Sequence, residues 1–211
     1  MPGLGHAQPP IERSSLPSTQ QQNMLTKQSQ YTAFEENNGQ VQGADGSKVK
    51  HTFKSGNLSV FLMQDGMAYQ FNKTHYPEGY KPPSKFETPE ERAAQVKLKE
   101  QIRTETYRMD VKLINANTNA QIITEGRSSD YVMYYNQDAL DVHSYSKITY
   151  KEVYLHIDWV IYTNDKHIKY DFVVHPGGNP ADILLQTQHV EDLQVKTDGR
   201  LLLKNRMGCI T

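Results

Sequence analysis

Apolar and polar residues alternate in two neighbouring segments between residues 155 and 175, and this period of two predicts a pair of β-strands. The alternating apolar positions are Leu155, Ile157, Trp159 and Ile161 in the first segment, and Ile168, Tyr170, Phe172 and Val174 in the second. A two-residue turn at Asn164-Asp165 would pair Trp159 with Tyr170. Such a hairpin would gather its apolar side chains on one face.

Shorter alternating runs predict further strands on both sides of this hairpin. They lie at residues 49–53, 58–62, 107–113, 122–124, 131–135, 144–150, 183–185, 193–195 and 201–203, with Ile210 at the start of another. Asp65-Gly66 and Asp198-Gly199 suit tight hairpin turns, and the first of these would pair Leu62 with Tyr69. Short strands joined by hairpin turns favour an all-β antiparallel sandwich over a parallel α/β fold.

One helix is expected among these strands. Thr88 suits the capping position of a helix, Pro89 suits the first turn, and the acids Glu90 and Glu91 complement the helix dipole. The apolar stripe that follows is thin. We therefore predict one short surface helix around residues 89–103.

The first 30 residues differ in composition from the rest of the chain. They contain four prolines and the run Gln20-Gln21-Gln22, with almost no periodic apolar residues. This composition is typical of a disordered tail or linker. The remainder, residues 31–211, is long enough for a single β-rich domain.

Composition and charge narrow the range of partners. The chain has 23 Lys and Arg against 24 Asp and Glu, so we expect no nucleic-acid partner. Cys209 is the single cysteine, which excludes an internal disulfide. No apolar run reaches about 18 residues, so we expect no membrane insertion. The N-terminal residues lack the basic and apolar regions of a signal peptide.

Two acids form a candidate site on the polar face of the predicted hairpin. The Asn164-Asp165 turn would place Asp158 directly opposite Asp171, where like charges repel. A basic neighbour such as Lys169, a raised pKa, a bound hard cation such as calcium, or a register shifted by two would each relieve this repulsion. We rank the shifted register or a basic partner first, and we predict no other cofactor.

The histidines offer a weaker possibility on the same hairpin. His156 and His175 flank its polar face and are able to bind a transition metal together with an acid. The eight histidines follow no ligand spacing such as H-E-x-x-H. We therefore interpret them as exposed strand residues and predict no transition-metal site.

The tyrosines suggest a second candidate site. There are 13 of them, and they are dense between residues 131 and 170. Tyr134, Tyr145, Tyr150 and Tyr162 are candidates for a sheet face that stacks against glycans, because an aromatic ring offers an apolar face and a polar hydroxyl. High β propensity alone is the simpler explanation of their number.

The sequence contains no motif that requires catalysis. It has no G-x-S-x-G elbow and no nucleotide fingerprint, and the glycines and prolines of residues 176–180 fit a turn better than a phosphate loop. We therefore predict that the chain is not an enzyme. Paired acids on a sheet leave a carboxylate-based glycoside hydrolase as a remote alternative.

Several motifs resemble, in order, the uncharacterised N-terminal domain of large secreted bacterial proteins. They are Phe34-Glu35-Glu36-Asn37 with Gly39-Gln40, Tyr154 with Ile157-Asp158 and Tyr162, Tyr170-Asp171-Phe172-Val173-Val174 with Pro176-Gly177 and Pro180, and Asp198-Gly199 with Leu201. The resemblance covers roughly residues 31–211. The family usually has an alanine where Gly178 stands.

The resemblance implies a location and a context. Such proteins carry SBBP-type β-propeller repeats or other surface modules, and many, particularly in Bacteroidetes, end in a gliding-motility-associated or type IX secretion sorting domain. We therefore expect an extracellular or cell-surface location, with downstream domains of the same polypeptide as partners and a truncated C-terminal end. A noncatalytic structural or adhesive module, in contact with surface glycans or proteins, is the favoured function. The alternative is a carbohydrate-binding module that uses the tyrosine-rich face.

Overall fold

A computed structural model describes residues 33–43, 46, 48–84, 88–134, 139–164 and 167–211 of the chain. Within this part, the chain forms antiparallel β-strands, one α-helix and a short 3-10 helix at Pro180–Asp182. The predicted all-β class with a single surface helix is therefore confirmed. The tail predicted over residues 1–30 lies outside the described residues.

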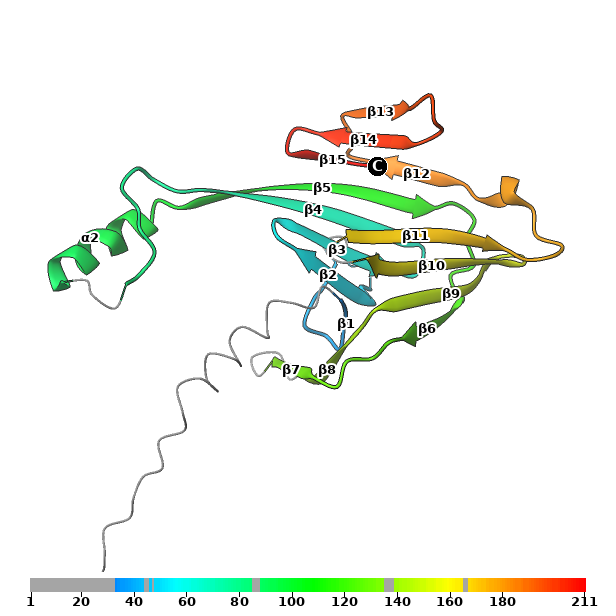
Figure 1. The fold of residues 1–211 in the computed structure, drawn as a ribbon, viewed down its shortest axis with the longest axis horizontal. Helices are drawn as coiled ribbons and strands as arrows, with labels where there is room; N and C mark the ends of the chain where they lie inside the picture. Colours follow the sequence, from blue (N-terminus) through cyan, green and yellow to red (C-terminus); the bar gives the residue numbers. More distant parts are fainter. Residues whose placement is uncertain (1–32, 44–45, 47, 85–87, 135–138, 165–166) are drawn as a thin grey trace, which may run out of the picture. The chain divides into compact units, whose positions relative to one another are not determined.

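The strands form three antiparallel sheets (Figure 1). The first contains β1 (Phe34–Glu36), β2 (His51–Ser55), β3 (Leu58–Met63), β4 (Gly66–His75), β5 (Arg103–Leu113), β7 (Tyr131–Tyr134), β8 (Ala139–Tyr145) and β12 (Leu185–Gln188). The second contains β6 (Gln121–Glu125), β9 (Lys147–Tyr154), β10 (Ile157–Asn164) and β11 (His167–Val174). The third contains β13 (Asp192–Val195), β14 (Leu201–Asn205) and β15 (Gly208–Ile210).

The strand order shows how the sheets are assembled from hairpins. In the first sheet the order is β12-β5-β4-β3-β2-β1-β8-β7, in the second it is β11-β10-β9-β6, and in the third it is β13-β14-β15. Most neighbours in this order are also neighbours in sequence, as expected of hairpin-built sheets. Ile210, predicted to begin a strand, instead ends β15.

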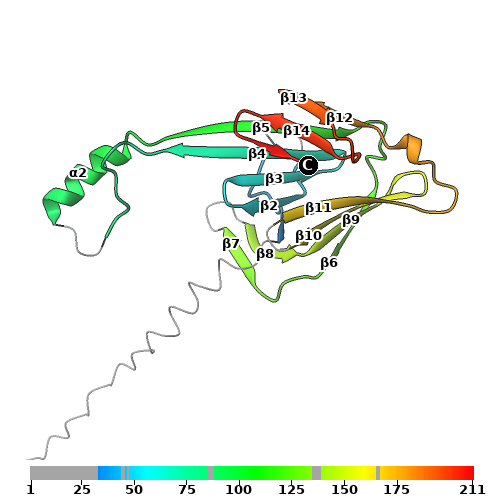
Figure 2. The same cartoon turned by 45° about the horizontal axis from the view of Figure 1, so that its top comes forward.

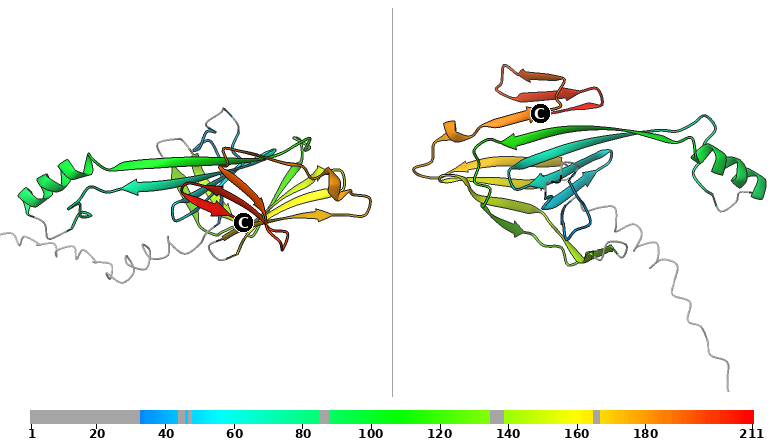
Figure 3. Two further views of the ribbon diagram at one scale, coloured as in Figure 1. Left: turned by 90° about the horizontal axis from the view of Figure 1, so that it is seen from above. Right: turned by 180° about the vertical axis from the view of Figure 1, so that it is seen from behind.

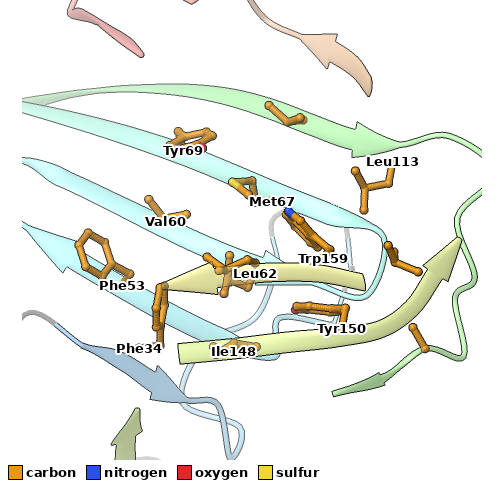
Figure 4. Close-up of a cluster of buried hydrophobic side chains, with 14 of the residues drawn as sticks. Phe34, Phe53, Val60, Leu62, Met67, Tyr69, Leu113, Ile148, Tyr150 and Trp159 are labelled. Atoms are coloured by element: carbon orange, nitrogen blue, oxygen red, sulfur yellow. The ribbon is translucent and has the colours of Figure 1, made fainter. Parts of the chain in front are cut away.

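The hydrophobic core lies between the first and second sheets. Tyr150 of β9 and Trp159 of β10 point toward Leu62 of β3 and Met67 of β4 (Figure 4). Each of these four side chains is at most 1% exposed. Their alternation in sequence follows from this arrangement, since every second residue of a strand faces the opposite sheet. The fold is thus a β-sandwich.

The chain passes from one sheet to the other at Ser146, the one residue that separates β8 from β9. The Ser146 amide donates to the Glu125 carbonyl at 3.1 Å, and its carbonyl accepts from the Thr163 amide at 3.1 Å. A side chain at Gly126, which has φ +66°, would collide with the Ser146 hydroxyl. The predicted strand over residues 144–150 therefore spans a corner between two sheets.

Both predicted hairpin registers are wrong by two residues. Trp159 pairs with Phe172 rather than Tyr170, and Leu62 pairs with Met67 rather than Tyr69. A shift of two keeps every side chain on its predicted face, because side chains alternate with a period of two. The apolar pattern alone therefore cannot distinguish the two registers.

Two residues of the predicted hairpins have other roles. Leu155 was expected on the apolar face, but it lies in the turn before β10, beside His156 at φ +58°, and is 70% exposed. Gly66 was expected in a turn, but it begins β4 and pairs with Lys112. A Cβ at Gly66 would collide with the Val111 carbonyl, so this glycine permits the close approach of β5.

The helix begins as the sequence predicts. In α2 (Pro89–Lys99), the Thr88 hydroxyl accepts from the Glu91 amide and the Glu91 carboxylate accepts from the Thr88 amide, which completes a capping box. It ends at Lys99, earlier than the predicted residue 103, and contains no buried residue. None of the described helices is long and apolar enough to cross a lipid bilayer.

Trp159 is expected to contribute more to stability than any surface residue. Its ring contacts Tyr150 with centroids 5.0 Å apart and stacks on Phe172 at 6.2 Å. Trp159→Ala should lower the free energy of unfolding by about 3–5 kcal/mol, the usual cost of deleting a buried large aromatic residue. Urea unfolding followed by circular dichroism measures it, with Val195→Ala at a 73% exposed position as the control. A loss below about 1 kcal/mol would contradict the core assignment.

Candidate functional site

The site is built around a β-bulge in β9. Tyr154 pairs with Ile157 and Tyr150 pairs with Trp159, so the three residues 151–153 stand opposite Asp158 alone. Glu152, at the centre of these three, has φ +50°. Bulges of this kind bend a strand and are frequent beside functional sites.

The carboxylate of Asp158 occupies the space that the bulge opens. Asp158 is only 4% exposed. Its Oδ1 accepts from the Glu152 amide at 2.8 Å, and its Oδ2 accepts from Lys151 Nζ and from His175 Nε2, the latter at 2.8 Å. The bulge is also held from its other side, where the Asn117 amide donates to the Val153 carbonyl at 2.8 Å.

These contacts keep Asp158 ionised. Burial alone raises the pKa of the carboxyl group, but hydrogen bonds from Lys151, the Glu152 amide and His175 outweigh it and lower the pKa to about 2. The buried charge is therefore paired, as a stable interior requires.

A glycine turn closes the cluster on the β11 side. The His175 amide donates to the His156 carbonyl at 2.9 Å, and Gly177 at φ +93° lies against the His156 ring. A Cβ at Gly178 would come within 2.8 Å of the His156 carbonyl oxygen. Glycine therefore fits this turn more easily than the alanine that the resemblance predicts. We call Lys151, Glu152, His156, Asp158 and His175 the Asp158 cluster.

The predicted pair of Asp158 and Asp171 does not form as expected. Asp171 pairs with Val160, two residues away from the predicted partner. The register shift and a basic partner were both ranked first, and both occur, but the basic partners are Lys151 and His175 rather than Lys169. The pKa of Asp158 is lowered by these partners and not raised. The repulsion that suggested calcium is therefore already relieved.

The Asp158 cluster has the residue types of a metal site but not its geometry. His175 and Lys151 both approach the same carboxylate oxygen, and His156 Nδ1 lies 3.8 Å from the Glu152 carboxylate. Over the residues that the structure describes, no group of three or more His, Cys, Asp or Glu side chains could hold a metal ion. Chemically, the cluster neutralises a buried acid and fixes three strands.

The four candidate tyrosines do not share one surface. Tyr150 is fully buried against Trp159, so its assignment to a glycan-stacking face is wrong. The Tyr134 hydroxyl donates to Glu35 and the Tyr145 hydroxyl donates to Glu36, each at 3.1 Å. Tyr162 lies in the second sheet, where it bonds with Asp171.

Glu35 and Glu36 explain why even the two tyrosines of the first sheet are separated. These acids are consecutive residues of β1, and consecutive strand residues point to opposite faces. Tyr134 and Tyr145 therefore reach the sheet from opposite sides. A shared stacking platform would need both rings on one side.

A second buried acid was missed by the sequence analysis. Asp110 in β5 is 5% exposed, and its carboxylate contacts Arg108 Nη2 at 2.7 Å and His189 Nδ1 at 3.1 Å. Arg108 and Asp110 are two apart in a strand, which is a usable signal, since such residues share a face. His189 is distant in sequence, and no local pattern connects it with Asp110.

Side chains of the first motif of the resemblance pack in the core or hydrogen-bond to the backbone around β1. Phe34 is fully buried. The Asn37 side-chain amide donates to the carbonyls of Val41 and Val49 at 2.7 and 2.8 Å, and the Gln40 amide donates to the Glu36 carbonyl at 2.6 Å. These side chains thus tie the segment after β1 to the backbone on both sides of it.

Tyr154 also hydrogen-bonds to backbone carbonyls, and its bonds join the two sheets. Its hydroxyl lies 3.1 Å from the Ile114 carbonyl and 3.3 Å from the Leu184 carbonyl. Tyr154 is buried, and burial raises the pKa of its hydroxyl. Tyr154 thus connects the end of β9 to the segments that follow β5 and precede β12.

The described residues thus define a β-sandwich domain whose buried acids and motif side chains bind other parts of the same domain. The chain belongs to a family of domains of unknown function, DUF7948, whose model matches residues 34–211. No curated protein and no solved structure matches the chain.

The lowered pKa of Asp158 makes a prediction about stability and pH. The folded state binds fewer protons than the unfolded state between the ordinary pKa of 3.8 and the folded value of about 2. The contribution of Asp158 is therefore complete above about pH 4 and disappears as the pH falls toward 2. Asp158→Asn should lower the free energy of unfolding by about 1–2 kcal/mol at pH 7. The loss is this small because Lys151 and His175 are partly exposed, so solvent screens their interaction with the carboxylate.

Urea unfolding of the wild type and the Asp158→Asn variant at pH 7, 5, 4 and 3 measures this effect. The difference in the free energy of unfolding between the two proteins should become smaller below about pH 4. Burial lowers the pKa of His51 to about 4, which destabilises both proteins as the pH falls from 6.5, so this effect cancels in the difference. Asp171→Asn is the matched control, and it should change the free energy of unfolding by less than about 0.5 kcal/mol. A difference that stays constant down to pH 3 would contradict the assignment.

Proposed function

We propose that residues 34–211 form a noncatalytic structural or adhesive module of a larger secreted or cell-surface bacterial protein. The observation that carries this proposal is the use of the motif side chains. Asn37, Gln40 and Tyr154 donate to backbone carbonyls, and the buried Asp158 accepts from His175. The residues that carry the family resemblance therefore support a scaffold.

The resemblance supplies the context of the proposal. SBBP-type repeats or gliding-motility-associated and type IX secretion domains would follow such a module in the complete polypeptide. An antiparallel sandwich suits a spacer of this kind, because its strands are held by hydrogen bonds along their length. The downstream domains are the first expected partners, and surface glycans or proteins are the second.

The enzymatic alternative has little support. A glycosidase needs two carboxyl groups that face a common substrate, one as an acid and one as a base or nucleophile. Asp158 is buried and bonded to three donors, and Asp110 is buried and bonded to Arg108 and His189. Both acids are therefore occupied by contacts within the domain.

Accessibility on intact cells tests the proposal directly. An antibody against residues 34–211 would follow the protein in the producing bacterium after treatment with an external protease. We expect loss of the signal from intact cells, because a surface module is accessible to the protease. A cytoplasmic protein serves as the protected control. Persistence of the signal until the cells are lysed, in cells whose secretion is intact, would contradict a surface location.

The sequence of the gene on both sides of the chain provides a second test. A signal peptide before residue 1 and repeats after residue 211 would support the proposed context. An intact gene that encodes only these 211 residues would contradict it.

A further inference from the structure

A tight turn brings two tyrosines together between β4 and α2. The Tyr80 amide donates to the Pro77 carbonyl at 3.1 Å, and Gly79 at φ +79° allows the chain to reverse. The rings of Tyr76 and Tyr80 consequently stack, with centroids 5.4 Å apart and planes inclined by 13°. Tyr80 is half-buried, whereas Tyr76 is 63% exposed.

Helix α2 holds this turn in place. The Gln95 side chain accepts from the Lys81 amide at 2.8 Å and donates to the Gly79 carbonyl at 3.2 Å. The helix lies at the end of the β4–β5 pair in Figure 2 and in both views of Figure 3. Since α2 contains no buried residue, it adds nothing to the core. Its contacts through Gln95 hold the backbone on both sides of Tyr80.

The strand ends before the turn supply polar groups. Thr74 and Thr104 are paired across β4 and β5 with hydroxyls 3.4 Å apart, and His75 Nε2 lies 3.5 Å from the Glu105 carboxylate. All four residues are exposed. The exposed Tyr76 ring thus directly follows the end of β4, where these hydroxyl, imidazole and carboxylate groups lie across the β4–β5 pair.

We propose that Tyr76, supported by Tyr80, is a stacking platform for a sugar ring of a cell-surface glycan. A pyranose has an apolar face of C–H groups and a rim of hydroxyls, which suit an exposed ring and nearby hydrogen-bonding groups. The inference deepens the adhesive form of the proposed function and rests on it for access to glycans. It uses none of the four tyrosines that the sequence pattern selected.

Other ligands fit this arrangement less well. Proline-rich peptides dock into grooves between aromatic side chains, whereas face-to-face stacking of Tyr76 and Tyr80 leaves an outer ring face and no slot between the rings. Single-stranded nucleic acids also stack on aromatic rings, but their phosphates require a positively charged groove. The chain has 23 basic against 24 acidic residues, so its charge balance gives no support for such a groove.

Binding of the purified chain to an array of immobilised neutral oligosaccharides tests this site. The array presents glucose, mannose, galactose, xylose and N-acetylglucosamine polymers, and the Kd for any hit is measured by calorimetry. Tyr76→Ala should weaken binding about tenfold or more, because it removes the stacking surface. Tyr76→Phe should retain most of the affinity. Tyr80→Ala should also weaken binding, because it removes the support for the Tyr76 ring.

The matched control is Tyr131→Ala, which removes a 50% exposed tyrosine from β7 and should leave the Kd unchanged. Thermal unfolding of each variant checks that the fold is intact. Absence of binding to every saccharide would overturn the inference, and so would equal affinity of the wild type, Tyr76→Ala and Tyr80→Ala. If the array shows no binding but the domain is accessible to external protease, only the proposed sugar site is overturned. A protected domain that binds sugar through Tyr76 would overturn only the surface location.

Discussion

The carboxylate of Asp158 accepts hydrogen bonds from Lys151, the Glu152 amide and His175, and these bonds hold the bulge through which β9 pairs with β10. Three residues of β9 stand opposite one residue of β10, so the bulge needs partners for its backbone groups. Asp158 supplies one acceptor, and Asn117 supplies donors from the other side. An unpaired carboxylate in this position would be strongly destabilising.

The core follows from this local arrangement. Beyond the bulge, Tyr150 stands opposite Trp159, and both rings face the first sheet. The corner at Ser146 then carries the same strand into the first sheet, where Phe34 pairs with Tyr145. One continuous stretch of chain therefore contributes to both layers of the sandwich. The adhesive surface that we propose lies elsewhere, beside a helix that contributes nothing to this core.

Much of the fold could be predicted because strand alternation and helix capping are local. The apolar faces of β10 and β5, and the Thr88 cap of α2, are correct for this reason. Hairpin register could not be predicted, because a shift of two leaves every face unchanged. Tyr150 was misassigned because tyrosine suits both cores and surfaces.

The candidate site was only partly predictable. Asp158 was selected as one of two facing acids on the polar face of the hairpin, but its burial was not predicted, and its partner Lys151 becomes a neighbour only through the bulge in β9. No alternation pattern signals a bulge of three residues against one. The stacking of Tyr76 on Tyr80 could not be predicted from strand patterns, because it depends on the turn between them.

Amide hydrogen exchange at Glu152 tests most directly whether Asp158 holds the bulge. In the wild-type protein this amide donates to the Asp158 carboxylate at 2.8 Å and should exchange slowly. In Asp158→Ala the Glu152 amide should lose its protection, while the amides of Val60 and Leu62 in β3 keep theirs. Equal protection of the Glu152 amide in the two proteins would contradict the role that we assign to this carboxylate.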